Sequence, residues 1–361
     1  MMKNNHRSLP KTAPLIIGYA SNANSGNVDQ AILDGANIII WSFIHLHITD
    51  DSKCTIKTSL DLVEIKRIRE KYSHVVHQVA FGGWNGPHPP NFSDGSSLSG
   101  QKWCEVFMKF NEVNNFLFDG IDWDYEGHDN LDAPTSKFTL ETLDIMANFT
   151  TEAKSHGLIT SMAPAESYLD ASVVADSIDA TFSLRLDLPP RAWTSPEDRD
   201  MIKGFSHAGR QCYAYVLAQA GVEAFDFISI QLYEGYSPYV YDVSRRKMNS
   251  VEAIMERVNG FVEGYVVNGL PLSSPEYKVK IPPSKLVIGV ANRWADGVKF
   301  AKMNPKNLRD AYETTKNKFG EGFLGVMFWT VEEEGNDAES RMTHELKKKF
   351  QDLHPGDSGE L

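Results

Sequence analysis

The sequence predicts one α/β domain, a (β/α)8 TIM barrel whose site lies at the carboxyl ends of the strands. Its 361 residues are enough for one such barrel with elaborated βα loops. Eight short apolar runs alternate with helical patterns, which is typical of parallel strands covered by helices. Polar or glycine-rich residues follow the runs, so we expect a site at that end of the barrel.

In the first half of the chain, apolar runs alternate with amphipathic helical patterns. We predict strands at 15–20, 36–44, 75–81 and 116–126, and helices at 28–33, 59–72 and 103–114. Ser59 has a side chain suited to cap the second helix. Residues 82–100 are rich in Gly, Pro, Asn and Ser, and therefore predict a long loop.

The second half continues the alternation. We predict strands at 158–164, 225–233, 285–291 and 323–329, and helices at 136–156, 208–220, 251–262 and 308–319, with one more helix after Glu339. Residues 170–207 predict an irregular excursion. Only about 30 residues separate the last two strands, so no α+β insertion domain is expected there. The barrel should span 14–354, between tails at 1–13 and 355–361.

The strand predicted at 116–126 carries acidic residues among apolar ones. Alternate residues of a strand share a face, so Asp122, Asp124 and Glu126 point one way while Trp123 and Tyr125 point the other. Carboxyl groups packed together in a partly dry site titrate as a coupled set. Glu126 comes last, where the strand would reach solvent, and suits a proton donor. Cation ligands usually lie on loops, so we expect no metal.

This strand resembles a known signature. Asp119-Gly-Ile-Asp122-Trp-Asp124-Tyr-Glu126 is similar to the DxxDxDxE motif of glycoside hydrolase family 18, the chitinases and endo-β-N-acetylglucosaminidases. The resemblance implies substrate-assisted retaining hydrolysis. Glu126 would act as acid and base, Asp124 would hold the substrate acetamido N–H, and Asp122 would be its electrostatic partner. Asp119 has the other strand parity and is expected to be structural.

Two further strands strengthen the resemblance. Gln231 and Tyr233 resemble the family QxYN motif, in which Tyr binds the acetamido oxygen, although Glu234 replaces the Asn. Trp329 ends the eighth strand and matches the Trp that forms the floor of the −1 subsite. All four are therefore expected to line the substrate site.

Gly82 and Gly83 resemble the glycines of the family SxGG motif, with Ala80 in place of Ser. Glycines at a strand end let the backbone approach a ligand closely. Trp84 follows them and is expected to stack on a sugar, although a Trp that only covers the surface fits equally well.

The remaining expected substrate contacts lie at other strand ends. The fifth strand resembles that of the family, whose Met, here Met162, lies against the −1 sugar. Glu166 follows at the mouth and is within reach of a ligand. Tyr19 and Phe43, near the ends of the first two strands, are expected to line the same cleft.

Composition excludes several classes of partner. A formal net charge of −12 argues against nucleic acid, which is held by clustered Lys and Arg. No apolar run approaches the ~20 residues of a membrane span, so no membrane partner is expected. Cys54, Cys104 and Cys212 are too scattered for a disulfide framework or a zinc site. We expect a monomer without cofactor.

The start of the chain lacks the apolar segment of a secretory signal. The compartment is therefore unknown: the chain would be extracellular if an upstream signal had been removed, and cytoplasmic otherwise.

The expected activity is endo-acting hydrolysis of β-1,4 linkages between N-acetylglucosamine units of chitin or chitooligosaccharides. One alternative is an endo-β-N-acetylglucosaminidase acting on N-linked glycans, which would use the same acidic strand. The other is a non-hydrolytic chitin-binding lectin on the same scaffold. Such lectins typically lack the acid, so the presence of Glu126, Asp124 and Tyr233 favours an enzyme.

Overall fold

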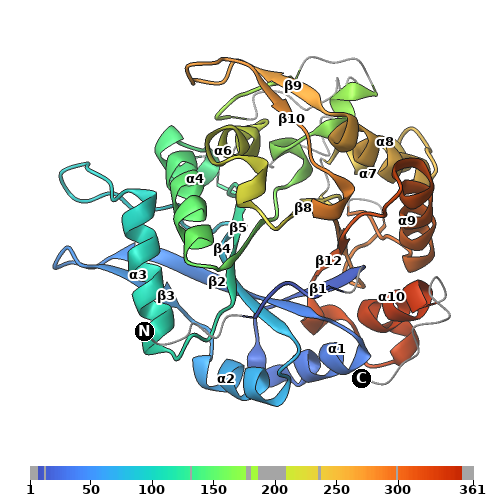
Figure 1. The fold of residues 1–361 in the computed structure, drawn as a ribbon, viewed down its shortest axis with the longest axis horizontal. Coiled ribbons are helices and arrows are strands. Elements are labelled where there is room, and N and C mark those ends of the chain that lie inside the picture. The colour runs from blue at the N-terminus through green and yellow to red at the C-terminus, as the bar shows by residue number, and fades with distance from the viewer. Residues whose placement is uncertain are drawn as a thin grey trace.

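Eight parallel strands close into a barrel in the computed structural model (Figure 1). The structure describes residues 7–11, 14–130, 132–175, 180–185, 209–234, 237–297 and 300–351. The barrel strands are β1 (Leu15–Ala20), β2 (Ile38–Ile48), β4 (Val76–Gly83), β5 (Gly120–Tyr125), β6 (Ile159–Met162), β8 (Phe227–Gln231), β11 (Leu286–Ala291) and β12 (Gly325–Trp329). Their order is β1-β12-β11-β8-β6-β5-β4-β2, and pairing of β1 with β2 closes the barrel. The predicted (β/α)8 barrel is confirmed.

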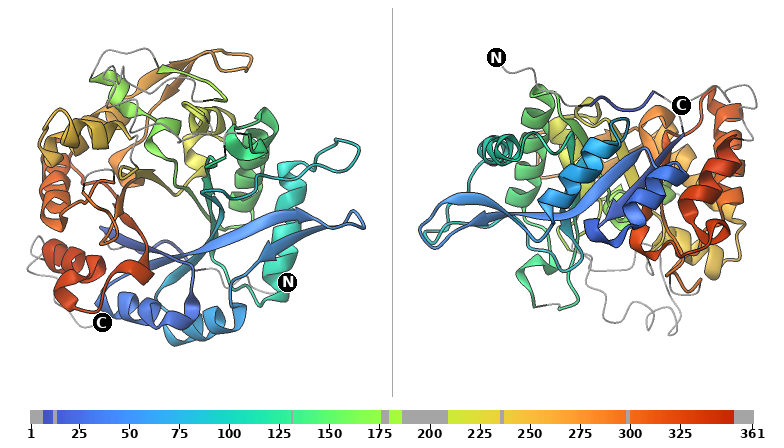
Figure 2. Two further views of the ribbon diagram at one scale, coloured as in Figure 1. Left: turned by 180° about the vertical axis from the view of Figure 1, so that it is seen from behind. Right: turned by 90° about the horizontal axis from the view of Figure 1, so that it is seen from below.

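Helices surround the strands (Figures 1 and 2). They are α1 (Asn27–Asp34), α2 (Leu62–Lys71), α3 (Gly100–Val113), α4 (Leu140–Ser155), α6 (Cys212–Ala220), α7 (Pro238–Ser244), α8 (Ser250–Glu263), α9 (Pro305–Phe319) and α10 (Met342–Gln351). The prediction that α2 begins at Ser59 is wrong. Its N-cap is Asp61, whose side chain accepts hydrogen bonds from the backbone N–H groups of Val63 and Glu64.

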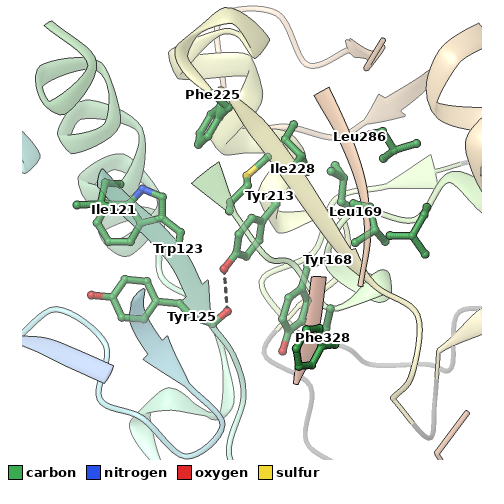
Figure 3. Close-up of a cluster of buried hydrophobic side chains, with 14 of the residues drawn as sticks. Ile121, Trp123, Tyr125, Tyr168, Leu169, Tyr213, Phe225, Ile228, Leu286 and Phe328 are labelled. Carbon is green, nitrogen blue, oxygen red and sulfur yellow. Dashed lines mark hydrogen bonds between the residues drawn. The ribbon is translucent and has the colours of Figure 1, made fainter. Parts of the chain in front are cut away.

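Two apolar layers lie on the two faces of the barrel wall. The inner layer includes Leu15, Ile17, Ile38, Ile40, Val76, Ile159, Phe227, Val287 and Met327. In the outer layer, which Figure 3 shows in part, Trp123 stacks on Phe81 at 4.9 Å between ring centroids and meets Phe149 of α4 edge-on at 5.1 Å. Strand β5 therefore turns its aromatic residues outward and its carboxyl groups inward.

The acidic strand is shorter than predicted and begins at Gly120 rather than at residue 116. Asn115 and Phe116 adopt left-handed conformations, with φ of 60° and 54°, which interrupt an extended strand. The Asn111 side chain then satisfies Phe118, because it donates to the Phe118 carbonyl at 2.8 Å and accepts from its N–H at 2.9 Å. The assignment of the carboxylates to one face is unaffected.

Strand β2 continues into a hairpin that the sequence did not predict. It runs on to Ile48 and pairs antiparallel with β3 (Cys54–Thr58). Figure 2 shows this hairpin as an arm that extends beyond the ring of helices.

A small second sheet was also not predicted. It has the order β10-β9-β7 and consists of Tyr277–Val279, Tyr265–Asn268 and Ala180–Thr181. Between β11 and β12, the described residues hold helix α9 and no further strand, in line with the expected lack of an insertion there. Most of the predicted excursion at 170–207 and the predicted tail at 355–361 lie outside the described residues.

Asp119 lies just before β5 and is held by ionic contacts. Arg69 donates two hydrogen bonds to its carboxylate, at 2.5 and 2.7 Å, and the His77 N–H donates a third at 2.9 Å. The backbone N–H of Arg7 donates a fourth at 2.9 Å. Asp119 therefore ties the start of the chain to α2 and β4, at the amino end of the strands.

Candidate active site

Strand β5 directs Asp122 into the closed interior of the barrel. The Asp122 side chain is fully buried and accepts hydrogen bonds from the Tyr19 hydroxyl of β1 and from Ser161 Oγ of β6, the latter at 2.5 Å. Burial raises its pKa to about 7, although both hydrogen bonds favour the ionised form. The sequence reasoning missed Ser161, which faces inward because it lies opposite Asp122 in the β5–β6 register.

Gln231 of β8 links the next two carboxyl groups. Its Nε2 lies 2.8 Å from Asp124 Oδ1, 3.0 Å from Glu126 Oε1 and 2.7 Å from the Ala163 carbonyl. The predicted residues Asp124, Glu126 and Gln231 therefore meet at the carboxyl end of the barrel. Glu126 is only 7% exposed, so the expectation that it reaches solvent is wrong.

The electrostatic environment favours protonated carboxyl groups. Burial and the Glu234 carboxylate raise the pKa of Glu126 to about 8. Burial, and then the charges of Glu126, Asp122 and Glu234, raise the pKa of Asp124 well above its usual range. Like charges in a dry site disfavour ionisation, so Glu126 holds a proton near neutral pH and can donate it.

Three consecutive carbonyl groups at the end of β5 are held from outside the strand. The Tyr213 hydroxyl of α6 donates to the Tyr125 carbonyl at 3.0 Å (Figure 3), and His88 Nε2 donates to the Glu126 carbonyl at 2.9 Å. The backbone N–H of Asn85 donates to the next carbonyl along the chain, that of Gly127, at 3.1 Å. We call His88, Asn85 and Tyr213 the carbonyl clamp. The backbone that carries Glu126 is thus fixed beyond the last ladder pair of its strand.

His88 of the clamp lies between aromatic rings. It stacks on Phe138 at 5.2 Å and meets Tyr125 at 5.3 Å between centroids. Burial lowers the pKa of His88 to about 4, so the imidazole is neutral and its Nε2–H points to the carbonyl. The sequence carried no signal for this role, because His88 lies within a proline-rich loop and is not itself part of a motif.

Trp329 contributes the flat side of the site. Its ring stacks on Phe43 at 5.8 Å with an angle of 20° between the planes, and contacts Tyr19 at 5.5 Å. A Cβ on Gly83 would come within 2.4 Å of the Phe43 ring, so this position needs glycine. The structure brings these predicted residues together as one aromatic floor, formed by Tyr19, Phe43 and Trp329.

Tyr233 lies just beyond the end of β8, beside this floor. It meets Trp294 edge-on at 6.0 Å, and Trp294 Nε1 donates to the Trp329 carbonyl at 2.7 Å. Burial and the charges of Glu234, Glu126 and Asp124 raise the pKa of Tyr233 well above its usual range, so its hydroxyl keeps its proton. Trp294 was missed, although a Trp that follows a buried strand is a recognisable signal.

Gly82 allows β4 to lie close to the acidic strand. Its φ is +115°, and an added Cβ would lie 2.3 Å from the Asp124 carbonyl oxygen. The glycine pair is therefore explained by close packing against β5 and the floor. Ala80, in place of the family Ser, packs in the inner layer.

Met162 does not belong to the site, and this prediction is wrong. It pairs in register with Trp123 and is fully buried in the outer layer, between the barrel and its helices. The inward residues of β6 are Ile159 and Ser161 instead. A side chain on the outer face of the barrel wall cannot reach a ligand at the mouth.

Glu166 is also not available to a substrate, contrary to expectation. It is 1% exposed, accepts from Arg257 Nε and from the Tyr239 N–H, both at 2.8 Å, and is hydrogen-bonded by Ser237. Arg257 also pairs with Asp242 at 2.6 Å. Glu166 is therefore part of a buried ion cluster that joins the segment after β6 to α7 and α8.

Trp84 lies at the rim, where its Nε1 donates to Asp129 Oδ1 at 2.9 Å. The same carboxylate accepts from Asn85 Nδ2 at 2.7 Å, which ties the loop after β4 to the segment after β5. Contact of Trp84 with a sugar stays a prediction, as does contact of Glu234.

No cofactor site emerges from the described part of the chain. Within it, no cluster of His, Cys, Asp and Glu could hold a metal ion, and no helix has the length and apolarity needed to cross a bilayer. The three cysteines are free thiols.

The chain belongs to the glycosyl hydrolases of family 18, whose family model matches residues 15–347. The Legionella pneumophila ChiA C-terminal domain is similar with a TM-score of 0.56, at 13% identity over 95% of this chain and 99% of that one. An Ostrinia furnacalis Group IV chitinase in complex with allosamidin gives a TM-score of 0.52, at 12% identity and coverages of 96% and 100%.

A third similar structure is not described as a glycosidase. The xylanase-alpha-amylase inhibitor protein XAIP-I, in complex with trehalose, gives a TM-score of 0.51 at 14% identity, with coverages of 93% and 99%. No curated protein sequence matches the chain. At these identities the structural likenesses show the fold alone, so an activity has to be argued from the side chains of this site.

Proposed function

We propose that this protein hydrolyses β-1,4 linkages between N-acetylglucosamine units of chitin or its oligosaccharides, with endo action and retention of configuration. One observation carries the proposal. Glu126 is buried, its pKa is raised to about 8, and Gln231 joins it to Asp124 beside an aromatic floor. A protonated acid next to a second carboxyl group and a flat apolar ring is what cleavage of such a sugar chain requires.

In the first step, Glu126 gives its proton to the glycosidic oxygen while the bond from that oxygen to the anomeric carbon breaks. The acetamido oxygen of the same sugar attacks the anomeric carbon and forms an oxazolinium ring, so the substrate supplies the nucleophile. Asp124 accepts the acetamido N–H, the Tyr233 hydroxyl donates to the acetamido oxygen, and Trp329 packs beneath the sugar. Asp122, buried behind Asp124, takes part in the shared titration.

In the second step, the Glu126 carboxylate removes a proton from water. The water oxygen bonds to the anomeric carbon from the face that the leaving group vacated, and the oxazolinium ring opens. Glu126 is again protonated, and the new reducing end is β. Because the acetamido group is the nucleophile, a glucose polymer or fully deacetylated chitosan cannot react in this way.

The alternative of a non-hydrolytic binding protein has support from the fold alone, since XAIP-I has a similar fold. The side chains favour an enzyme, because the acid, its neighbouring carboxyl groups and Tyr233 are all present around Gln231. Action on N-linked glycans would use the same groups. Parallel digestion of colloidal chitin and a high-mannose glycoprotein separates these two substrates.

The decisive experiment compares the wild type with Glu126→Gln. The substitution keeps the size and hydrogen bonding of the side chain but removes the transferable proton, so turnover of a fluorogenic chitooligosaccharide should fall by at least ~10²-fold. Oligosaccharide binding, measured by calorimetry, should persist. Glu105→Gln on the exposed face of α3 makes the same side-chain replacement away from the site and should leave the rate unchanged.

Early-time NMR of the wild-type products completes this experiment. The β-anomer should appear first, and cellulose oligomers should not be cleaved. An initial α-anomer, or a Glu126→Gln rate within tenfold of wild type, would contradict the proposed mechanism.

A further inference from the structure

The β2–β3 hairpin has one buried face and one open face. Ile44, Leu46 and Ile56 are buried, and β3 contacts helix α3. The opposite face carries two cross-strand pairs, His45 with Lys57 and His47 with Thr55. We call these four residues the inner hairpin face. They are half-buried, apart from Lys57, which is exposed.

The inner hairpin face continues the aromatic floor of the site. The register between β2 and β4 shifts between Ser42 and Ile44, which leaves Phe43 on the same side of the strand as His45 and His47. Phe43 stacks on Trp329 at 5.8 Å. The hairpin is thus an arm that starts at the floor and extends beyond the barrel (Figure 2).

The side chains on this face can bind an uncharged, hydroxyl-rich ligand. The His45 side chain is half-buried; its Nδ1 is shielded from solvent and has no hydrogen-bond partner among the described residues, so a ligand would contact the rest of the ring. Burial and the neighbouring Lys57 lower the pKa of His45, so its ring is neutral near pH 7, with one donor and one acceptor. Imidazole rings also offer flat surfaces to a sugar, and the exposed ammonium group of Lys57 adds further donors.

Charge selects among possible ligands for this face. The whole chain has a net charge of −12, which disfavours a polyanionic chain. Lys57 on the face itself disfavours a polyamine such as deacetylated chitosan. The other lysine of the hairpin, Lys53, is paired with Asp51 at 2.6 Å. A neutral, acetylated sugar chain is the ligand that fits.

We propose that the inner hairpin face is an additional glycan-binding site, which holds the sugars adjoining the one above Trp329 in a neutral β-linked N-acetylglucosamine chain. The identity of that chain rests on the proposed function. The consequence is a preference for long chains, because a short oligosaccharide fills the floor without reaching His47 and Lys57.

The test measures binding separately from catalysis. In the Glu126→Gln protein, affinities for N-acetylglucosamine oligomers of three and six sugars are measured by calorimetry. The parent should bind the six-sugar chain more tightly. His47→Ala combined with Lys57→Ala should weaken six-sugar binding by about tenfold, the effect of one or two lost hydrogen bonds, and three-sugar binding much less. Lys53→Ala is the matched control and should weaken neither.

A gain-of-binding variant guards against simple misfolding. His47→Trp enlarges the flat surface, so it should tighten six-sugar binding several-fold. Equal losses for both chain lengths, no loss, or no preference of the parent for six sugars would overturn the proposal. Tighter binding of a sulfated glycan than of the neutral chain would overturn it as well. Absence of turnover by the wild type would instead refute the proposed function, while these binding measurements would still decide the role of the hairpin.

Discussion

The raised pKa of Glu126 predicts how activity depends on pH. In the proposed reaction the free enzyme must hold Glu126 protonated, so kcat/KM falls as pH rises through the pKa of about 8. At pH 7 about 90% of the molecules then carry the proton, and at pH 9 about 9% do, a tenfold loss. With its ordinary value of 4.5, only about 0.3% would be protonated at pH 7, ~300-fold less.

Substitution of Glu234 tests what raises the pKa of Glu126. Its charge is the second cause of the raised Glu126 pKa, after burial, and it also acts on Asp124. Glu234→Gln removes the charge, so protonated Glu126 is favoured less and the alkaline limb should move to lower pH. The limb should stay above pH 4.5, because burial remains. Glu105→Gln, which removes one charge from exposed α3, should leave the limb in place.

The assay is the initial rate on a fluorogenic chitooligosaccharide below KM, from pH 5 to pH 10. The limb belongs to the coupled carboxyl groups of Glu126 and Asp124 rather than to one residue alone. A wild-type limb at or below pH 6 would refute the argument that burial keeps the acid protonated. An unshifted or alkaline-shifted limb in Glu234→Gln would refute the role assigned to Glu234.

Two further predictions concern stability. Arg257→Met leaves the buried Glu166 without its cation and Asp242 with only the partly exposed Arg246, and should cost ~3–5 kcal/mol. For 361 residues this lowers the thermal midpoint by about 4–7 °C. Lys102→Met, in an exposed pair, should cost below ~1 kcal/mol. Gly82→Ala places a Cβ 2.3 Å from a backbone oxygen at positive φ. It should cost ~1–3 kcal/mol in the free energy of unfolding measured with urea, and kcat should fall. A wild-type midpoint in Arg257→Met or in Gly82→Ala would contradict the packing described.

The barrel could be predicted because its signals are local. Buried parallel strands are short apolar runs, and the parity of β5 assigns Asp122, Asp124 and Glu126 to one face whatever the exact start of the strand. The start itself could not be predicted. It depends on Asn111, whose side chain replaces the ladder hydrogen bonds of Phe118, and nothing in the apolar run from residue 116 indicates this.

The two wrong site residues have different physical reasons. Strands of a barrel are apolar on both faces, so the sequence of β6 does not tell whether Met162 or Ser161 faces inward; only the pairing with β5 decides. Glu166 was assigned to the mouth because it is a charged residue after a strand. Its partner, Arg257, lies 91 residues away, and such distant ion pairs leave no local pattern.

The carbonyl clamp limits how the acid can move. A peptide group whose carbonyl is engaged cannot rotate without losing that hydrogen bond, and three successive carbonyls are engaged here by Tyr213, His88 and Asn85. In the proposed reaction Glu126 must face first the glycosidic oxygen and then a water molecule. Only the χ torsions of the Glu126 side chain can make that change of direction, because the hydrogen-bonded main chain stays in place.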